Sequence, residues 1–254
     1  MKLEGHTAVV TGGARGIGLA ITKKLLQNKV KVYFLDVDIT EGKSVQQHLD
    51  KEYGKGLAIF YSCDVTNAEQ FKDILTKIAE ENGSLDILCN NAGIGPTDDF
   101  QKLIDVNLTG TINGTKSAID LMDTNKGGKG GNVINISSVA GLAFIPTPEP
   151  SYTASKHGIV GFTRSMAQSA IKMGVRLNCI CPSTVDTRML RETFKNAELK
   201  EIASSLGTAI QSTDIVAKGF LQLLEDEEKV GEAMRITSQK GIDYHSFSPE
   251  PIPY

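Results

Sequence analysis

The amino-acid sequence predicts an α/β domain with a parallel sheet that is covered by helices on both faces. Apolar segments with strand character alternate with amphipathic segments of helical period over the first 182 residues. Strands that are apolar throughout are typical of a parallel sheet buried on both sides. A glycine-rich turn follows the first strand, where doubly wound folds bind their ligands. Because no shift in composition marks a boundary, residues 1–254 are predicted to form one domain.

The expected strands are short apolar runs bounded by glycine, proline or polar residues. They lie at residues 6–12, 31–38, 57–65, 85–93, 132–138 and 175–182. Helical periodicity between the strands predicts helices at residues 18–29, 41–54, 68–83, 100–123 and 152–173. Residues 188–213 have no strand pattern, and we expect them to form a helical lid over a substrate site.

Composition and charge restrict the class of protein. The 254 residues carry a net charge of -3, which gives no basic footprint for nucleic acid. No segment has the roughly 18 to 20 apolar residues that a membrane-spanning helix needs, and the N-terminus lacks an apolar stretch of signal-peptide length. Cys63, Cys89, Cys179 and Cys181 lie in apolar runs without metal-ligand spacing. We therefore expect buried free thiols rather than disulfides, no metal site and a cytoplasmic protein.

The turn "TGGARGIG" at residues 11–18 has the features of a dinucleotide site. Gly12, Gly16 and Gly18 permit a tight turn and a close approach of the backbone to a pyrophosphate at the helix N-terminus. A glycine turn alone is weak support. It becomes strong when an acidic residue ends the second strand, as Asp36 does twenty residues after Gly16.

The residues around Asp36 bear on the choice of dinucleotide. A carboxylate at this position accepts hydrogen bonds from adenosine ribose hydroxyls and repels a 2′-phosphate. The alternative is a solvated turn aspartate. Arg15 favours a 2′-phosphate, since a guanidinium pairs well with phosphate oxygens. Val37 adds no second cation, so the sequence favours NAD.

Tyr152 and Lys156 are four residues apart in "YTASK", so on a helix they share one face. Taken alone, the pair would be an ordinary exposed helix pair. Beside a dinucleotide site it has a chemical use, because converting an alcohol to a ketone needs a base. A free phenol with a pKa of about 10 is mostly protonated at neutral pH, and a nearby ammonium favours the phenolate.

Several motifs in order along the chain resemble the short-chain dehydrogenase/reductase family. They are the glycine turn, "CDV" at 63–65, "NNAG" at 90–93, Asn107, "NISS" at 135–138 and "YTASK" at 152–156. Within it, "GGKGG" at 127–131, "ASKHGIVGFTRS" at 154–165 and "ITSQKGI" at 236–242 resemble the NAD-dependent 15-hydroxyprostaglandin dehydrogenases. The resemblance implies a Rossmann-type fold and an NAD-dependent oxidoreductase.

The resemblance implies a catalytic tetrad of Asn107, Ser138, Tyr152 and Lys156. Tyr152 would be the base, Lys156 would lower its pKa, Ser138 would hold the substrate oxygen, and Asn107 would hold a water behind Lys156. Ser137 is the alternative to Ser138, because alternation along a strand lets one of them point into the cleft. The implied cofactor contacts are Gly12, Arg15, Gly16, Ile17, Gly18, Asp36, Val37, Asp64, Val65, Asn91, Gly93, Tyr152, Lys156, Val185 and Thr187.

Four departures from the family pattern lie on the substrate side. Ser183 replaces a usual glycine, the loop before Tyr152 is one residue longer, and the 188–213 lid is shorter than in the prostaglandin enzymes. Glu149 replaces an uncharged residue that faces substrate together with Ser138 and Tyr152. Its carboxylate would disfavour compact anionic substrates.

The sequence thus predicts an NAD-dependent enzyme that interconverts a secondary alcohol and a ketone. The expected substrate is a hydroxylated lipid such as a 15-hydroxyprostaglandin-like molecule, and the alternative is a steroid or a small aliphatic alcohol. A hypothesis of another class is a catalytically silent NAD-binding sensor or scaffold. The resemblance also implies a homodimer that pairs through the helices at 100–123 and 152–173.

Overall fold

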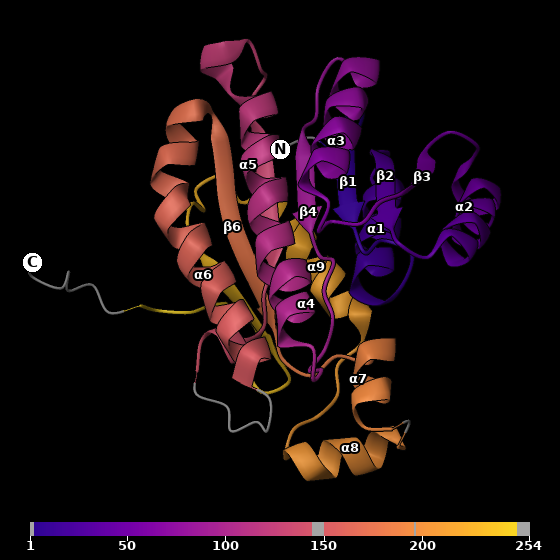
Figure 1. The fold of residues 1–254 in the computed structure, drawn as a ribbon, viewed down its shortest axis with the longest axis vertical. Coiled ribbons are helices and arrows are strands. Elements are labelled where there is room, and N and C mark those ends of the chain that lie inside the picture. The colour runs from indigo at the N-terminus through magenta and orange to yellow at the C-terminus, as the bar shows by residue number, and fades with distance from the viewer. Residues whose placement is uncertain (1–2, 144–149, 196, 248–254) are drawn as a thin grey trace, which may run out of the picture.

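Eight strands form one sheet at the centre of the described part of the chain. The computed structural model describes residues 3–143, 150–195 and 197–247. The strand order is β3-β2-β1-β4-β5-β6-β7-β8, and neighbours are parallel except for β7 and β8 (Figure 1). The strands are β1 (Thr7–Thr11), β2 (Lys31–Asp36), β3 (Ala58–Ser62), β4 (Ile87–Asn90), β5 (Gly131–Ile136), β6 (Val175–Pro182), β7 (Ala233–Thr237) and β8 (Gly241–Tyr244).

The strand order reverses between β1 and β4, which are neighbours in the sheet although β2 and β3 lie between them in sequence. Val10 of β1 is in register with Phe34 of β2 on one side and with Cys89 of β4 on the other. Every residue of β1 and β4 is buried. The predicted doubly wound sheet is confirmed, and its ligand crevice is expected at the carboxyl ends of these strands.

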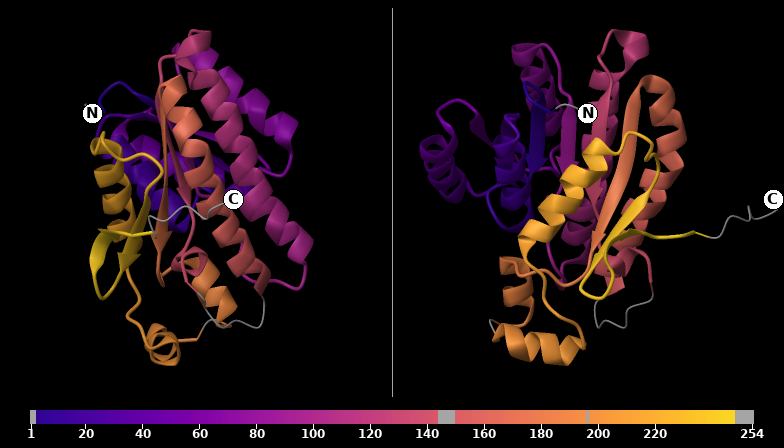
Figure 2. Two further views of the ribbon diagram at one scale, coloured as in Figure 1. Left: turned by 90° about the vertical axis from the view of Figure 1, so that its left-hand side faces the viewer. Right: turned by 180° about the vertical axis from the view of Figure 1, so that it is seen from behind.

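Helices cover both faces of the sheet (Figure 2). One layer contains α1 (Gly16–Gln27), α2 (Ile39–Tyr53) and α9 (Thr213–Glu225). The other contains α3 (Ala68–Asn82), α5 (Gly110–Met122) and α6 (Pro150–Ala170). Each layer has its own buried apolar cluster, centred on side chains such as Ile21 and Phe220 in the first and Phe71 and Ile119 in the second.

The helix predicted at 100–123 is divided into three parts. It consists of α4 (Phe100–Ile104), a π-helical turn at Asp105–Thr109 and then α5. A π turn inserts one extra residue into a helix and is often found at functional sites. Its central residue, Asn107, is fully buried.

Three elements near the C-terminus were absent from the sequence prediction: α9, β7 and β8. Strands β7 (AMRIT) and β8 (GIDY) mix apolar with charged or polar residues and are only partly buried, so they lack the continuous apolar run that marks the predicted strands. The sheet is parallel from β3 to β7, as predicted, and the additional strand β8 is antiparallel to β7, because only a few residues connect the two and so short a connection forms a hairpin.

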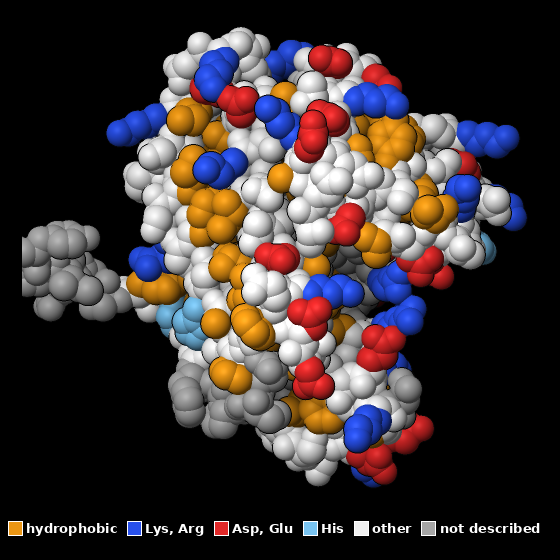
Figure 3. Space-filling model, viewed as in Figure 1, with side chains coloured by type: hydrophobic (Ala, Val, Ile, Leu, Met, Phe, Trp, Pro, Cys, Tyr) orange, Lys and Arg blue, Asp and Glu red, His pale blue; other side chains and the backbone are white. Residues whose placement is uncertain are grey.

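The segment predicted as a lid contains α7 (Arg188–Thr193) and α8 (Leu199–Leu206). Both helices lie beyond the carboxyl ends of the strands (Figures 1 and 2). The prediction of free buried thiols is confirmed, since all four cysteines are free and buried. No helix in the described ranges is both long and apolar enough to cross a membrane. Hydrophobic side chains gather along α5 and α6 on the face shown in Figure 3.

Candidate active site

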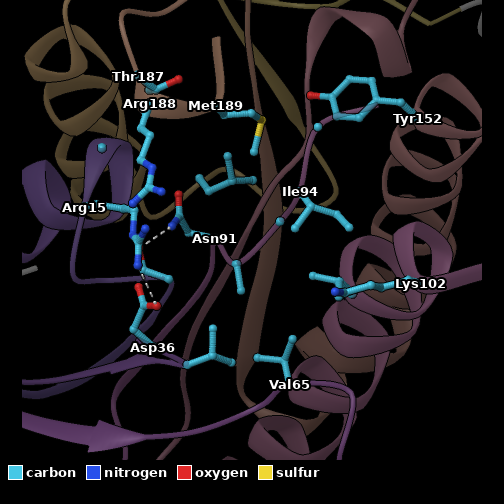
Figure 4. Close-up of a pocket in the computed structure, with 18 of the residues that line it drawn as sticks. Arg15, Asp36, Val65, Asn91, Ile94, Lys102, Tyr152, Thr187, Arg188 and Met189 are labelled. Carbon is cyan, nitrogen blue, oxygen red and sulfur yellow. Dashed lines mark hydrogen bonds and ion pairs between the residues drawn. The ribbon is translucent and has the colours of Figure 1, made fainter. Parts of the chain in front are cut away.

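A cleft of ≈ 1050 Å³ runs along the carboxyl edge of the sheet. It extends from the end of β2 past the glycine turn to the first turn of α6. Residues of α7 also line it (Figure 4). Predicted residues that line the cleft are Gly12, Arg15, Gly16, Ile17, Asp36, Val37, Asp64, Val65, Asn91, Gly93, Tyr152, Lys156 and Thr187. Sequence positions spread over 176 residues are therefore brought together in one groove.

The glycine turn has the shape that a bound phosphate group needs. Gly12 and Gly16 have φ of +60° and +54°, in the left-handed region that favours glycine. Gly18 does not line the cleft but lies behind the turn. A Cβ on Gly18 would lie 2.1 Å from the carbonyl oxygen of Gly12, so a larger residue would displace the turn. The sequence requirement at Gly18 is thus one of close packing.

Asp36 is held in place by backbone donors. Its carboxylate accepts hydrogen bonds from the backbone N–H of Ala14 at 3.4 Å and of Asp38 at 3.2 Å. Arg15 points toward it, with Nη2 at 3.6 Å from Asp36 Oδ1 and at 2.9 Å from Asp38 Oδ2. A backbone hydrogen bond from Glu41 and the Arg15 guanidinium hold the pKa of Asp38 below its usual value.

The sequence prediction did not include Asp38. This residue makes Arg15 a weaker indication of NADP binding. The guanidinium is already shared between two carboxylates, so it is less available to a 2′-phosphate. The same residues leave Asp36 oriented toward the cleft (Figure 4). This arrangement fits a dinucleotide with free ribose hydroxyls.

Asn91 joins the loop after β4 to the glycine turn. Its Nδ2 donates to the carbonyl oxygens of Thr11 at 2.8 Å and Gly12 at 3.1 Å, and its backbone N–H donates to Thr11 Oγ1 at 2.9 Å. Gly93 follows in the same loop. A Cβ there would lie 3.2 Å from Asn107 Oδ1 and 3.7 Å from Lys156 Nζ, so glycine leaves space between the loop and these side chains.

Tyr152 and Lys156 lie one turn apart at the start of α6, as predicted. The Lys156 ammonium lies 5.6 Å from the centre of the Tyr152 ring and donates to the carbonyl oxygen of Ile136 at 3.2 Å. Lys156 is buried. Its pKa is lowered to about 8, first by burial, which a nearby Cys181 partly opposes.

The pKa of Tyr152 differs from the sequence expectation. Burial raises it above the usual value for a phenol, and a hydrogen bond with Ser138 partly opposes this rise. The sequence predicts that the Lys156 ammonium lowers this pKa. In the protein alone, the cost of a buried phenolate is the larger effect. Tyr152 therefore stays protonated at neutral pH in this environment.

The two neighbouring serines have different partners. Ser137 is buried, and its hydroxyl donates to the backbone carbonyl of Lys156 at 2.9 Å. The hydroxyl of Ser138 accepts a hydrogen bond from Ala140 N at 3.1 Å and is hydrogen-bonded with Tyr152. Ser138 is therefore the serine beside the phenol, although it is Ser137 that is among the residues lining the cleft.

Asn107 holds the loop after β4 through Ile94. Its Oδ1 accepts from Ile94 N at 2.8 Å, and its Nδ2 donates to Ile94 O at 3.0 Å. The same Nδ2 donates to Ser155 Oγ at 3.3 Å, next to Lys156 in α6. The π turn thus places a side-chain amide between the cofactor loop and the helix that carries Tyr152.

Ser183, in the turn after β6, is hydrogen-bonded to Gln211. Gln211 Nε2 donates to Ser183 Oγ at 2.8 Å and to Ile236 O at 3.1 Å. Gln211 also forms a β-bridge with Val185, which is buried rather than on the cleft surface. Ser183 thereby ties the turn that precedes the predicted lid to the end of that lid, a role that no local sequence signal indicated.

Helix α7 forms a wall of the cleft. The sequence predicted a lid in this segment but did not identify which of its residues line the cleft. Met189 and Thr193 lie against the loop after β4, since a Cβ on Gly95 would be 3.2 Å from each side chain. Arg188 of the same helix also lines the cleft (Figure 4). Glu149, predicted to face substrate, lies outside the described residues. In the described ranges, no three His, Cys, Asp or Glu side chains are grouped as a metal site requires.

Comparison with known proteins identifies relatives along almost the whole chain. The model of the short chain dehydrogenase family matches residues 6–198. The chain is 38% identical over 262 residues to 15-hydroxyprostaglandin dehydrogenase (NAD+) of Bos taurus, covering 99% of this chain and 98% of the relative. It is 33% identical over 251 residues to the mitochondrial borneol dehydrogenase of Lavandula x intermedia, covering 95% and 92%.

A solved structure agrees with these sequence matches. The crystal structure of gox2181 has a TM-score of 0.80 to this chain at 28% sequence identity, covering 91% of this chain and 94% of that one. The residues matched by the family model include the glycine turn, Asn107, Ser138, Tyr152 and Lys156. The chain therefore belongs to the short-chain dehydrogenase family.

Proposed function

We propose that this protein interconverts a secondary alcohol and a ketone with NAD, and that its substrate is a hydroxylated lipid. The observation that carries this proposal is the meeting of Tyr152, Ser138 and Lys156 at the end of the dinucleotide cleft. A phenol that is hydrogen-bonded to a hydroxyl and lies near an ammonium is suited to moving the alcohol proton. Relatives that are named as NAD-dependent dehydrogenases support the same reaction.

NAD is the cofactor of this alcohol dehydrogenase. Asp36 would bind the adenosine ribose, the glycine turn would receive the pyrophosphate, and Asp64 and Val65, which line the same cleft, would contact the adenine. When bound, NAD supplies the hydride acceptor and a positive charge near the phenol. Thr187 lies close to the glycine turn, since a Cβ on Gly16 would be 3.5 Å from the Thr187 methyl group, and it would enclose the bound cofactor from the α7 side.

The roles of the tetrad follow from its contacts. With the positive charge of bound NAD favouring the phenolate, Tyr152 would take the hydroxyl proton of the alcohol, and in the reverse direction its phenol would return a proton to the ketone oxygen. Ser138, hydrogen-bonded with Tyr152, would hold the substrate oxygen in line with the phenol. Lys156 stabilises the negative charge that develops on Tyr152, because its ammonium lies near the ring in a buried site. Asn107 holds the loop at Ile94 against α6. It thereby fixes the position of the cofactor-binding loop relative to the helix that carries Tyr152.

The substrate class rests on the wall near Tyr152. Ile94 and Met189 face the same space as Tyr152 (Figure 4), and Pro96 and Val106 add further apolar surface to the lining. Apolar walls with a few polar groups at the reacting end are typical of sites for largely hydrophobic ligands. The full-length similarity to 15-hydroxyprostaglandin dehydrogenases favours a long hydroxylated lipid.

A panel of secondary alcohols tests this proposal. The panel contains a 15-hydroxylated fatty acid, its methyl ester, a hydroxysteroid and a short aliphatic alcohol, each assayed by NADH absorbance. We expect the highest kcat/KM for the hydroxylated lipids, and a strongly reduced kcat with Tyr152→Phe. Preference for the steroid or the short alcohol would reject the lipid assignment. NAD binding without turnover of any alcohol would instead identify a silent cofactor-binding protein.

We also propose a cytoplasmic homodimer. Four free buried thiols favour a reducing compartment. Hydrophobic side chains along α5 and α6 offer a surface on which a two-fold pair can form (Figure 3). Light scattering at micromolar concentration tests the assembly, and a monomer mass would reject it.

A further inference from the structure

Arg188 is a cation on α7 that extends into the cofactor half of the cleft. Figure 4 shows its side chain reaching from α7 toward Arg15, on the opposite side of the cleft from Lys102. It lines the cleft together with Arg15, Gly16 and Asp36. In sequence it lies more than 150 residues from all three.

The place of Arg188 along the cleft is set by its neighbour Thr187. The Thr187 methyl group would lie 3.5 Å from a Cβ on Gly16, so the chain entering α7 passes directly over the glycine turn. Gly16 is the first residue of α1, and a dinucleotide places its pyrophosphate at such a helix start. Arg188 therefore lies beside the position of the two phosphates.

The charges around Arg188 differ from those around Arg15. The Arg15 guanidinium is shared between Asp36 and Asp38. Arg188 pairs with Glu192 on its own helix, with Nε at 2.6 Å from Oε1. The Arg188 side chain is 64% exposed, so this pair is open to solvent and can exchange its partner at small cost.

We infer that Arg188 binds the pyrophosphate of the dinucleotide and thereby holds α7 against the glycine turn. The backbone N–H groups of the turn are neutral donors, whereas a guanidinium adds a full charge and a planar pair of donors that match phosphate oxygens. Before the dinucleotide binds, Glu192 holds the Arg188 guanidinium over the cleft. When the dinucleotide binds, Glu192 competes with its phosphates for the guanidinium. This inference rests on the proposed use of a dinucleotide, but it does not depend on the substrate.

Calorimetric titration of the protein with ADP-ribose and with adenosine tests the inference without turnover. Arg188→Gln should weaken ADP-ribose binding by about 10- to 100-fold, the usual value of one charge-assisted contact. Binding of adenosine, which has no phosphate, should change by less than about twofold. Arg191→Gln is the matched control, because Arg191 of the same helix pairs with Asp186 and does not line the cleft.

Glu192→Gln should act in the opposite direction. Removal of the competing carboxylate should tighten ADP-ribose binding by about two- to fivefold. In the unmodified protein, ADP-ribose should also slow hydrogen exchange at the backbone amides of α7. This protection should be absent in Arg188→Gln and present in Arg191→Gln.

Three results would overturn the inference. They are an unchanged ADP-ribose affinity in Arg188→Gln, an equal loss for adenosine, and a loss confined to NADP, which would place the guanidinium at a 2′-phosphate. In contrast, failure of the unmodified protein to oxidise any alcohol while it still binds ADP-ribose through Arg188 would reject the proposed function and leave this inference standing.

Discussion

The Lys156 ammonium lies 5.6 Å from the centre of the Tyr152 ring, and burial moves the pKa values of the two groups in opposite directions. The pKa of Lys156 is lowered to about 8, whereas that of Tyr152 is raised. In the protein alone, the lysine therefore loses its proton before the tyrosine does. Lys156 can stabilise a phenolate at Tyr152 only while the lysine is charged. The pH range of activity is therefore limited on its alkaline side by the loss of the Lys156 proton.

Tyr152→Phe should reduce kcat by about 10² to 10⁴, because the proton acceptor is removed while the ring remains. Thermal unfolding and ADP-ribose titration should show that folding and cofactor binding are nearly unchanged. Tyr61→Phe is the matched control, since Tyr61 lies on β3 away from the cleft lining. Retention of most of the activity in Tyr152→Phe would exclude this residue as the base.

The pH dependence of stability should reveal the buried Lys156. Its pKa is about 8 in the folded protein against an ordinary 10.5, so between these values the unfolded chain binds a proton that the folded chain does not. The Lys156 contribution to the free energy of unfolding should therefore rise with pH across this window, by at most about 1.4 kcal/mol per pH unit.

Lys156→Met isolates this contribution from those of the other titrating groups. We expect the difference in unfolding free energy between the unmodified protein and the variant to be constant below about pH 8 and to change in favour of the unmodified protein above it. Urea unfolding from pH 6 to 10 measures the difference. A pH-independent difference would show that Lys156 is not desolvated in the folded state.

Cofactor preference should depend on both carboxylates around Arg15. Asp36→Ala removes the ribose-binding group and the repulsion of a 2′-phosphate, so the ratio of kcat/KM for NAD over NADP should fall or reverse. Asp38→Ala should also lower the ratio, to a smaller extent, because it frees Arg15 from the 2.9 Å ion pair. Equal use of NAD and NADP by the unmodified protein would contradict the role given to Asp36.

Gln211 should be important for stability although it lies far from the tetrad in sequence. Gln211→Met leaves Ser183 Oγ without its buried donor and removes the contact to Ile236, at a cost of about 1 to 3 kcal/mol. Gln239→Met, in the turn between β7 and β8, is the exposed control. Chemical unfolding measures both, and equal small effects would remove any special role for the Ser183 contact.

The sequence predicted the parts of the site that are encoded locally. The glycine turn and Asp36 follow buried apolar strands, and Tyr152 and Lys156 are one helical turn apart, so short-range periodicity places each of them. Asp38 could have been found too, since an acidic residue two positions after Asp36 is within reach of Arg15.

Other features depend on contacts between distant segments. Arg188 meets the glycine turn, and Gln211 meets Ser183, only because β6 and its neighbours bring these segments together. The π turn at Asn107 is equally invisible in the sequence, because its one-residue shift is fixed by hydrogen bonds to Ile94 and Ser155 rather than by helix propensity. Burial, which sets the pKa of Tyr152, is a tertiary property as well.

The antiparallel strand at the end of the sheet affects how the protein behaves among other copies of itself. An exposed sheet edge can template pairing with another chain, which leads to aggregation. Here the edge strand, β8, has four residues and begins with Gly241 in the left-handed region at φ +70°. Asp243 on this strand is paired with Arg235 of β7, with Nε at 2.9 Å from Oδ1, which places charge on the short edge. So short a charged edge offers little template for intermolecular strand addition on this side of the sheet.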